Sequence, residues 1–310
     1  MGIAILVRYR SPKILQILSS SFCRPIRGGF FHIKKVIYIK KLLKWFGSKA
    51  KLLHTLTSKM PDTYNAFYEP FVGSGALIFN QEPHHGYIND LNTALVNVYI
   101  QLKNDPDQLI NELLDMDSFT CNSDRYYDLR RQYNEKLKTN NYDVETAALL
   151  LYLNKHCFSG LYRVNKKGEF NAAWNHRIKP DSLDTENLMA IGKYLSDNDI
   201  TIANEDFERF ADKAQPGDFV YFDSPYVPET KTANFVGYTS AGFSLDDQKR
   251  LAKLFQRLTE RKVFCMLSNS DTAITRSLYA DYRIDKVYVS RSIGGISNKK
   301  IGYEIIVTNY

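Results

Sequence analysis

A tetrapeptide in the last third of the chain places a carboxylate and an aromatic ring directly after an apolar run. Residues 218–222 (DFVYF) predict a buried strand, and Asp223-Ser224-Pro225-Tyr226 follow it. An exocyclic amine on a nucleobase is a poor nucleophile because its lone pair is delocalised into the ring. A carboxylate and a backbone carbonyl that accept its two N–H bonds would aim that lone pair at a methyl donor. Tyr226 could stack on a base rotated out of a duplex.

A glycine loop forms a second candidate site. In residues 69–75 (EPFVGSG), Gly73 and Gly75 lie between an expected strand and a helix, where backbone without Cβ atoms can approach a ligand closely. Asp90 follows Gly73 by 17 residues, where a carboxylate can bind both hydroxyls of a ribose. A dinucleotide fingerprint would need glycine in place of Ile78, so we expect S-adenosylmethionine rather than NAD. Each motif alone is compatible with an ordinary turn, and their combination favours a functional site.

The pattern of the chain supplies a sheet that can hold both motifs. From residue 41 onward, short β-rich runs alternate with helical periods, which is typical of a parallel α/β sheet. Ser244 is expected to cap the helix before the fifth strand. We expect strands at 64–69, 86–89, 201–204, 218–222 and 263–267, and a closing antiparallel pair at 282–290 and 303–308.

The alternation of strands and helices is interrupted between residues 93 and 199. The segment is mostly helical, and residues 165–168 (NKKG) predict a turn between arms that carry Tyr, Phe and Arg. We therefore expect residues 93–199 to form an inserted domain with a β-hairpin. A sheet domain built from residues 41–92 and 200–310 would carry it.

The positive charge of the chain lies at its beginning. Residues 1–61 contain 13 Lys and Arg and no Asp or Glu, whereas the rest holds 28 basic and 34 acidic residues. The net charge of +7 is therefore no evidence that the folded part binds nucleic acid. We interpret residues 1–40 as a dispensable basic extension, with a transit peptide, a DNA-binding arm or sequence upstream of the true start as alternatives.

Composition excludes several classes of protein. The longest apolar runs, such as residues 147–153, are far shorter than the roughly 20 residues that span a bilayer, so we expect no membrane segment. The four cysteines form no CxxC pair, which argues against a disulfide scaffold or a zinc ribbon. Adjacent His84 and His85 beside Glu82 lack a third ligand at a usual spacing, so we predict a polar loop and no metal site.

In the glycine loop, Asp90 and the tetrapeptide, the sequence resembles the adenine-N6 DNA methyltransferases of the Dam type. The resemblance extends from about residue 41 to residue 310. The resemblance implies a Rossmann-like methyltransferase sheet with an inserted target-recognition domain. It also implies transfer of a methyl group from S-adenosylmethionine to N6 of adenine in double-stranded DNA, with base flipping and GATC as the expected target. The family motifs stand in order at 44–49 (KWFGSK), 69–75 (EPFVGSG), 90–92 (DLN), 223–226 (DSPY), 232–235 (TANF) and 268–269 (SN).

The resemblance assigns residues to three roles. Asp223, Ser224, Pro225 and Tyr226 would be catalytic. Residues that would line the S-adenosylmethionine pocket are Trp45, Lys49, Phe71, Gly73, Gly75, Asp90, Asp206 and Asp223. Residues that would contact DNA are Lys44, Phe158, Ser159, Leu161 and Arg163, with Lys155, Lys166 and Lys167 as further phosphate contacts. Arg163 would read guanine, because a guanidinium can bond O6 and N7 together, and Phe158 and Leu161 would wedge or contact thymine methyl groups.

Structural roles remain as alternatives for several of these residues. Trp45 could be an ordinary core aromatic, and Lys49 a surface lysine at a helix start. Asp90 and Asp206 could each cap the helix that follows. Basic residues in the expected hairpin, Arg163 among them, could simply be solvated.

The sequence departs from the family pattern at three positions. Ser224 replaces the first proline of the usual tetrapeptide, which keeps the backbone carbonyl and loses a rigid ring. Ser159 stands where Dam proteins of the enterobacterial type usually carry Asn, and Ala173 where they carry Pro. The last two differences bear on the target sequence rather than on the chemistry.

Other functions stay open at this point. Methylation of cytosine N4, of RNA or of protein glutamine uses related tetrapeptides, and a decayed relative could bind DNA without methylating it. We expect a monomer that acts on double-stranded DNA in the cytoplasm of a bacterium or of a phage's bacterial host. A part in restriction-modification, in mismatch repair or in phage protection is equally compatible with the sequence.

Overall fold

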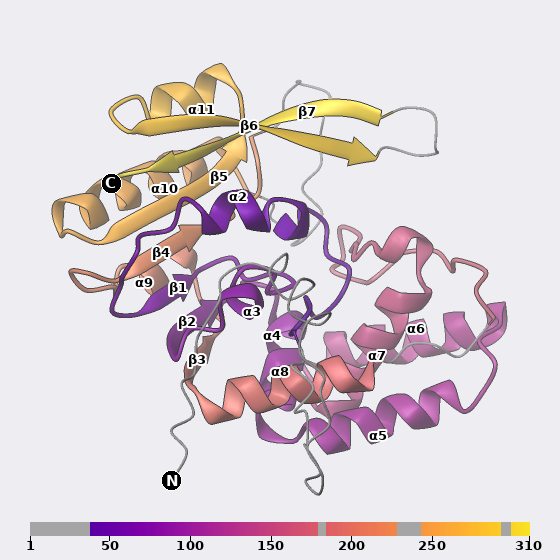
Figure 1. Ribbon diagram of the computed structural model, residues 1–310. Helices are drawn as coiled ribbons and strands as arrows, with labels where there is room; N and C mark the ends of the chain where they lie inside the picture. The colour runs from indigo at the N-terminus through magenta and orange to yellow at the C-terminus, as the bar shows by residue number, and fades with distance from the viewer. Residues whose placement is uncertain (1–37, 179–183, 228–242, 293–298) are drawn as a thin grey trace, which may run out of the picture. The chain divides into compact units, whose positions relative to one another are not determined.

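A seven-stranded sheet organises the computed structural model, which describes residues 38–178, 184–227, 243–292 and 299–310 (Figure 1). The predicted basic extension therefore lies almost wholly outside the described residues, as does the TANF segment at 232–235. The strands are β1 (Phe67–Glu69), β2 (His85–Asn89), β3 (Asp199–Ala203), β4 (Phe219–Phe222), β5 (Phe264–Ser270), β6 (Arg283–Ser292) and β7 (Lys299–Thr308).

The sheet has the order β3-β2-β1-β4-β5-β7-β6. Strands β1 to β5 are parallel, and β7 runs antiparallel between β5 and β6. The chain steps outward from β1 to β3 on one side and from β4 to β5 on the other, so the direction of winding reverses between β1 and β4. Ligands bind at this switch point in open α/β sheets, and the glycine loop and the tetrapeptide both leave strands there. The expected α/β class and the closing antiparallel pair are confirmed.

Strand boundaries differ from the prediction by a few residues. Strand β1 begins at Phe67 rather than at residue 64. The N–H of Ala66 donates to the Asp218 carboxylate at 3.1 Å, and the N–H of Asn65 donates to the Gly217 carbonyl at 2.9 Å. These bonds tie the residues before β1 to the residues before β4 without a regular ladder, which periodicity alone does not indicate.

Two hydrophobic clusters cover opposite faces of the sheet. In β4, Phe219 and Tyr221 belong to one cluster, and Val220 and Phe222 belong to the other. Because both faces are covered, every β4 residue is buried, and the continuous apolar run is explained. The helical segments are η1 (Lys49–Lys51), α2 (Leu53–Thr57), α3 (Ile78–Gln81), α4 (Thr93–Asn104), α5 (Pro106–Asp117), α6 (Ser123–Lys138), α7 (Val144–His156), η2 (Phe158–Gly160), α8 (Thr185–Asp197), α9 (Phe207–Ala211), α10 (Leu245–Glu260) and α11 (Ala273–Leu278).

Helix α10 begins where the sequence predicts. Ser244 is its N-cap, and the Ser244 hydroxyl accepts a hydrogen bond from the Asp247 N–H at 3.1 Å. The Asp247 carboxylate accepts the Ser244 N–H at 2.9 Å, which completes a capping box. The cap directs the apolar stripe of α10 onto the sheet beside β5.

Helices α4 to α8 occupy the chain between β2 and β3, in agreement with a mostly helical segment (Figure 1). Helices α4 and α8 pack on β3, while α5 and α6 pack on α7. The predicted turn is present: Gly168 has φ +79°, and the Asn165 N–H donates to the Glu169 carbonyl at 2.9 Å. Its arms are joined by an isolated bridge between Val164 and Phe170 rather than by paired strands. No helix in the described part of the chain has the length and hydropathy that crossing a bilayer requires.

Candidate active site

The Asp223 carboxylate and the Lys49 ammonium form an ion pair of 2.6 Å at the carboxyl end of β4. Their side chains are only 18% and 6% exposed, so Lys49 is not the surface lysine that the alternative interpretation proposed. Lys49 begins η1, and its ammonium also donates to the Gly47 carbonyl at 2.7 Å. The segment 44–49 therefore brings a buried cation to the tetrapeptide.

Burial and the lysine act on Asp223 in opposite directions. Burial raises the pKa of Asp223 to about 6, and the Lys49 ammonium counteracts part of that rise. The carboxylate is therefore mainly ionised at neutral pH, as a hydrogen-bond acceptor for an amino group must be. A titration this close to neutrality is also typical of functional carboxylates.

Tyr226 lies between Lys49 and the last strand. Its hydroxyl donates to the Glu304 carboxylate on β7 at 2.7 Å, and the Lys49 ammonium lies 4.6 Å from its ring centroid. Burial raises the pKa of Tyr226 well above its usual range, so the ring stays a neutral phenol. A base that stacked on Tyr226 would therefore use the face away from Lys49 or displace the ammonium.

Ser224 and Pro225, between Asp223 and Tyr226, differ in how they are held. Ser224 is 2% exposed, and its hydroxyl finds no hydrogen-bond partner among the described residues. The Pro225 carbonyl accepts a hydrogen bond from the Gln248 side chain at 2.8 Å. Gln248 was not among the predicted site residues, because nothing in the local sequence indicates which backbone atom α10 meets.

The glycine loop has the backbone that its sequence predicts. Gly73 and Gly75 have φ +49° and +69°, a region that favours glycine. A Cβ on Gly73 would come within 2.9 Å of the Trp45 ring, so the loop packs directly on that indole. Trp45 has an aromatic neighbour as well, because Tyr162 stacks on it with ring centroids 5.1 Å apart. Trp45 is half-buried against the core and also borders the loop.

Asp90 is joined to the glycine loop. Its carboxylate accepts the N–H of Gly73 at 3.1 Å and the N–H of Asn92 at 2.9 Å. Burial raises the pKa of Asp90 to about 6 despite these bonds. The N-cap of α4 is Asn92, whose side chain accepts the Leu95 N–H at 3.1 Å, so the interpretation of Asp90 as the helix cap is wrong.

Two buried residues beneath the loop were not predicted to have a role. Glu69 is 3% exposed, and its carboxylate accepts the Ile78 N–H at 3.2 Å. Burial and the nearby Asp223 raise the pKa of Glu69 well above its usual range. Tyr99 donates its hydroxyl hydrogen to the Gly73 carbonyl at 2.7 Å. The EPF segment contains Glu69, but only the fold shows that its side chain binds the backbone just after the glycine loop.

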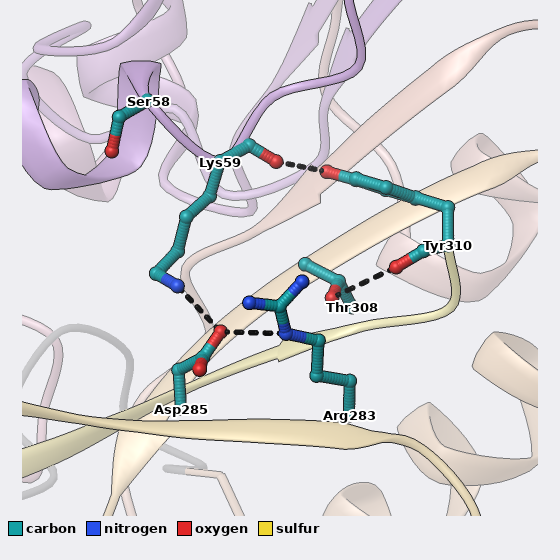
Figure 2. A pocket seen from close by; sticks show the side chains of 6 residues that line it. All are labelled: Ser58, Lys59, Arg283, Asp285, Thr308 and Tyr310. Carbon is teal, nitrogen blue, oxygen red and sulfur yellow. Dashed lines mark hydrogen bonds and ion pairs between the residues drawn. The ribbon is translucent and has the colours of Figure 1, made fainter.

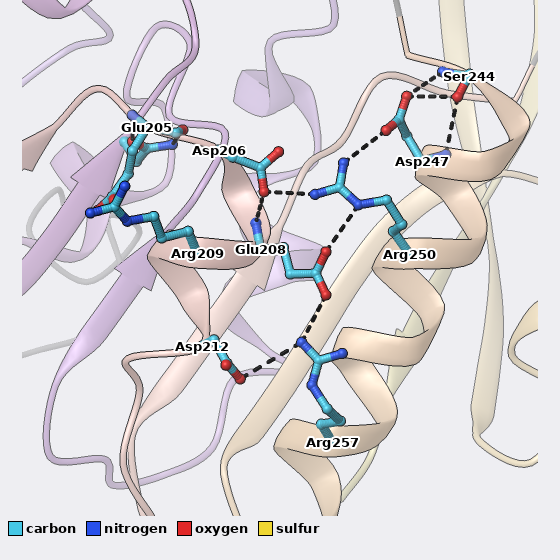
Figure 3. A network of polar contacts seen from close by, with 10 residues as sticks. Glu205, Asp206, Glu208, Arg209, Asp212, Ser244, Asp247, Arg250 and Arg257 are labelled. Carbon is cyan, nitrogen blue, oxygen red and sulfur yellow. Dashed lines mark hydrogen bonds and ion pairs between the residues drawn. The ribbon is translucent and has the colours of Figure 1, made fainter.

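Asp206 serves as a helix cap, as the structural alternative proposed. It is the N-cap of α9, and its carboxylate accepts the Glu208 N–H at 3.0 Å and pairs with Arg250 at 2.8 Å (Figure 3). Arg250 also binds Glu208 and Asp247, at 2.9 and 3.0 Å. Its guanidinium lies 4.9 Å from the ring centroid of Phe207.

Phe71 belongs to an aromatic cluster next to this network. The Phe71 ring lies 5.4 Å from Phe207 and 5.9 Å from Phe243, measured between ring centroids. Phe207 follows Asp206, so the cluster connects the EPF segment after β1 with the start of α9. The structure thus brings Phe71 and Asp206 into one region, as a shared pocket requires.

The predicted DNA-contacting residues lie on two linked loops. The Asn154 amide donates to the carbonyls of Lys44 and Gly160, at 2.9 and 3.2 Å, and so holds the two loops together. Phe158 is 65% exposed at the tip of the second loop. Ser159 is also exposed and has φ +59°, and Lys44 is exposed on the first loop.

Arg163 and Leu161 follow the same loop. Arg163 is exposed, and Asn171 orients it by accepting the Nε–H at 2.7 Å through its side chain and an Nη2–H at 3.3 Å through its carbonyl. Leu161 is half-buried. An arginine held by its Nε still has free guanidinium hydrogens to offer a base.

A pocket elsewhere on the molecule is not the candidate site. It has a volume of about 230 Å³ and is lined by Ser58, Lys59, Arg283, Asp285, Thr308 and Tyr310 (Figure 2). Thr308 pairs with Met266 near the start of β5, so this pocket lies at the amino edge of the parallel strands, opposite Asp223. Its cations are paired with Asp285, at 2.5 Å for Lys59 and 3.2 Å for Arg283. Within the described ranges, no group of three His, Cys, Asp or Glu is placed to hold a metal ion.

The sheet order and the position of both motifs at its switch point define a Rossmann-like methyltransferase fold. The model of the D12 class N6 adenine-specific DNA methyltransferases matches residues 45–293. The chain belongs to this family.

Curated relatives agree with this assignment. The type II methyltransferase M1.LlaDCHI of Lactococcus lactis subsp. cremoris is 42% identical over 278 residues, which cover 89% of this chain and 98% of that protein. The type II methyltransferase M.MjaIII of Methanocaldococcus jannaschii is 37% identical over 290 residues, which cover 88% and 99%. The DNA adenine methylase of Escherichia coli strain K12 is 31% identical over 270 residues, which cover 84% and 92%.

Proposed function

We propose that this methyltransferase transfers the methyl group of S-adenosylmethionine to N6 of adenine in double-stranded DNA, with GATC as its target. The observation that carries the proposal is the buried Asp223 carboxylate, ionised beside Lys49 at the switch point. The proposal includes a monomer that works in the cytoplasm, where DNA is accessible to it.

The described residues fit the cofactor. Gly73 and Gly75 present backbone without Cβ atoms, and the Asp90 carboxylate stands at the end of β2. The Asp90 carboxylate accepts backbone N–H groups of Gly73, Asn92 and Leu91, which leaves it lone-pair capacity for a ribose hydroxyl. Phe71 and its aromatic neighbours offer an apolar wall for an adenine ring. Trp45 packs directly against Gly73 of the loop.

The protein's part in the reaction is to hold and deprotonate the amino group. Asp223 and the Ser224 carbonyl would accept its two N–H bonds, which frees the nitrogen lone pair from the base ring. When bound, the cofactor supplies a methyl carbon on a positively charged sulfur, so that a C–N bond forms while the C–S bond breaks and its electron pair neutralises the sulfur. Asp223 would take the proton that the amino group loses and pass it to solvent. Lys49 keeps Asp223 ionised for this task.

Target recognition is proposed for the loops around Asn154. Exposed Arg163, oriented by Asn171, would bond O6 and N7 of a guanine. Phe158 would enter the base stack, and Lys44 would meet a phosphate. The choice of GATC rests on the likeness to Dam-type enzymes, and Ser159 and Ala173 are the positions at which a different target would arise.

Expression in a bacterium that lacks adenine methylation tests this function. Sequencing its genomic DNA for modified bases should reveal N6-methyladenine confined to GATC. Marks at another sequence would overturn the target, and marks on cytosine would overturn the chemistry. A soluble chain that leaves no mark would favour a non-catalytic DNA-binding relative. The Asp223→Ala variant, expressed in parallel, should leave the DNA unmodified.

A further inference from the structure

A network of buried hydrogen bonds lies behind the tetrapeptide. Gln248, in the first turn of α10, donates through Nε2 to the Pro225 carbonyl at 2.8 Å. Its Oε1 accepts the side-chain N–H of Asn269, at the end of β5, at 3.2 Å. The Asn269 Oδ1 in turn accepts the backbone N–H of Val227 at 3.2 Å. These bonds close a ring, here called the Gln248 ring, around the segment that leaves the tetrapeptide.

The ring is almost dry, because Gln248 is 3% exposed and Asn269 is fully buried. A buried amide is costly unless its hydrogen bonds are made, so a satisfied network of this kind strongly prefers one geometry. Ser270 adds a further bond, since its hydroxyl donates to the Val227 carbonyl at 2.7 Å. Both sides of Val227 are therefore fixed by residues at the end of β5.

The geometry of proline transmits this constraint to the reacting group. The pyrrolidine ring fixes φ of Pro225, so the peptide planes before and after it can turn only through ψ. The hydrogen bond from Gln248 to the Pro225 carbonyl fixes that ψ. The carbonyl of Ser224, in the preceding peptide plane, is then held in one direction relative to the segment that Gln248 and the end of β5 anchor.

We propose that Gln248 is a positioning residue that aims the Ser224 carbonyl at the amino group, with Asn269 holding Gln248 in place. The inference deepens the proposed function and depends on it. Ser224 itself lacks the ring that a proline would bring to this position, so its own φ is not fixed by covalent structure. The Gln248 ring restrains the tetrapeptide at its C-terminal end instead.

The test compares Gln248→Met with Gln256→Met in the full chain. Both glutamines lie on α10, but Gln256 is exposed, and among the described residues its amide meets only Glu260, at 3.0 Å. Methionine keeps the length of glutamine and removes its hydrogen bonds. We expect Gln248→Met to slow single-turnover methyl transfer by at least about tenfold. Dissociation constants for S-adenosylmethionine and for a GATC duplex should stay within about twofold of the wild-type values. A misdirected Ser224 carbonyl affects the reaction step, so it lowers the rate constant and leaves binding unchanged.

A second variant separates positioning from folding. Gln248→Glu cannot donate to the Pro225 carbonyl while ionised but can do so when protonated. Its rate relative to the wild type, measured at the same pH, should therefore rise as pH falls. A purely structural role would lower stability and both binding constants without this rescue.

The outcomes distinguish this inference from the proposed function. If neither the wild type nor Gln256→Met transfers a methyl group, the proposed function fails. If both do and Gln248→Met matches them, or if Gln248→Glu stays about tenfold or more below the wild type even at the acid end of the pH range, where its carboxyl group is protonated, Gln248 is not a positioning residue. Should Gln248→Met fail to fold, the pH dependence of Gln248→Glu decides.

Discussion

Lys49 and Asp223 form the ion pair on which the reaction depends in this account. Burial raises the pKa of Asp223 to about 6, and Lys49 opposes that rise. Replacing Lys49 with Met should move the pKa of Asp223 further upward, because the opposing charge is gone. The rate needs the ionised carboxylate, so the acid limb of its pH profile should shift to higher pH.

Single-turnover rates at saturating S-adenosylmethionine, measured across pH, check this shift. Lys51→Met, two residues along on the exposed side of η1, is the matched control and should keep the wild-type profile. A Lys49→Met profile that superimposes on that of the wild type would show that Lys49 does not control the ionisation of Asp223.

Glu69 makes a prediction about stability. Its pKa in the folded chain lies well above the usual value because of burial, so ionising it as pH rises costs folding free energy. The contribution of Glu69 to stability is thus fully present below the pKa that Glu69 has in the unfolded chain. It is lost as pH rises through the pKa that Glu69 has in the folded chain. Glutamine can still accept the Ile78 N–H and does not ionise.

Urea unfolding of Glu69→Gln and the wild type at pH 5 and pH 8 tests this loss of stability with rising pH. The free energy of unfolding of the variant, relative to the wild type, should increase from pH 5 to pH 8 by about 1 kcal/mol or more, the equivalent of roughly one pKa unit. A difference that stays constant between the two pH values would contradict the linkage.

At the scale of elements, Arg250 joins α10 to α9. It binds Asp206, Glu208 and Asp247 and lies over the Phe207 ring. Its side chain is 42% exposed, so solvent weakens each pair, and Arg250→Met should lower the free energy of unfolding by only about 1 kcal/mol.

The same substitution should affect the cofactor more than the DNA. Loss of Arg250 releases Asp206 and Phe207 beside the proposed adenine wall, so the dissociation constant for S-adenosylmethionine should rise several-fold. Calorimetric titration measures it, with Lys249→Met as control because Lys249 pairs only with Asp246 among the described residues. Equal affinities in the two variants would separate the Arg250 network from the cofactor pocket.

Elements with a local signal could be predicted from the sequence. The apolar run of β4, the cap at Ser244 and the positive φ at Gly73 each follow from residues adjacent in the chain. The start of β1 could not be predicted, since the bond from Ala66 to the Asp218 carboxylate joins residues 152 positions apart. For the same reason, the resemblance predicted a role for Asp206 in the cofactor pocket, but nothing in the sequence indicated its ion pair with Arg250.

At the scale of the whole molecule, the helices between β2 and β3 position the loops that we propose to contact DNA. Helices α4 and α8 share a hydrophobic cluster with the sheet, so this segment is anchored to the sheet. The break in the strand–helix pattern predicted a helical insertion, but the contact of α4 with β3 is long-range and has no local signature. The predicted residues Phe158 and Arg163 are exposed there, so both side chains are accessible to a duplex.

Arg163→Ala should relax the choice of target. Loss of a bidentate contact to guanine costs about 1–3 kcal/mol of discrimination. The rate on GATC should therefore fall about tenfold or more relative to duplexes with a substituted guanine. The double variant Lys166→Ala, Lys167→Ala should instead weaken all duplexes alike and reduce the salt dependence of binding. An Arg163→Ala enzyme that keeps wild-type discrimination would remove Arg163 from recognition.

The most direct test of the central claim follows labelled methyl groups from S-adenosylmethionine into a duplex with one GATC site. The purified full chain reacts in a single turnover, and mass spectrometry identifies the modified nucleoside. We predict N6-methyladenine as the product, formed by the wild type and not by a folded Asp223→Ala variant. A methyl group on any other atom, or transfer by Asp223→Ala at the wild-type rate, would contradict the account.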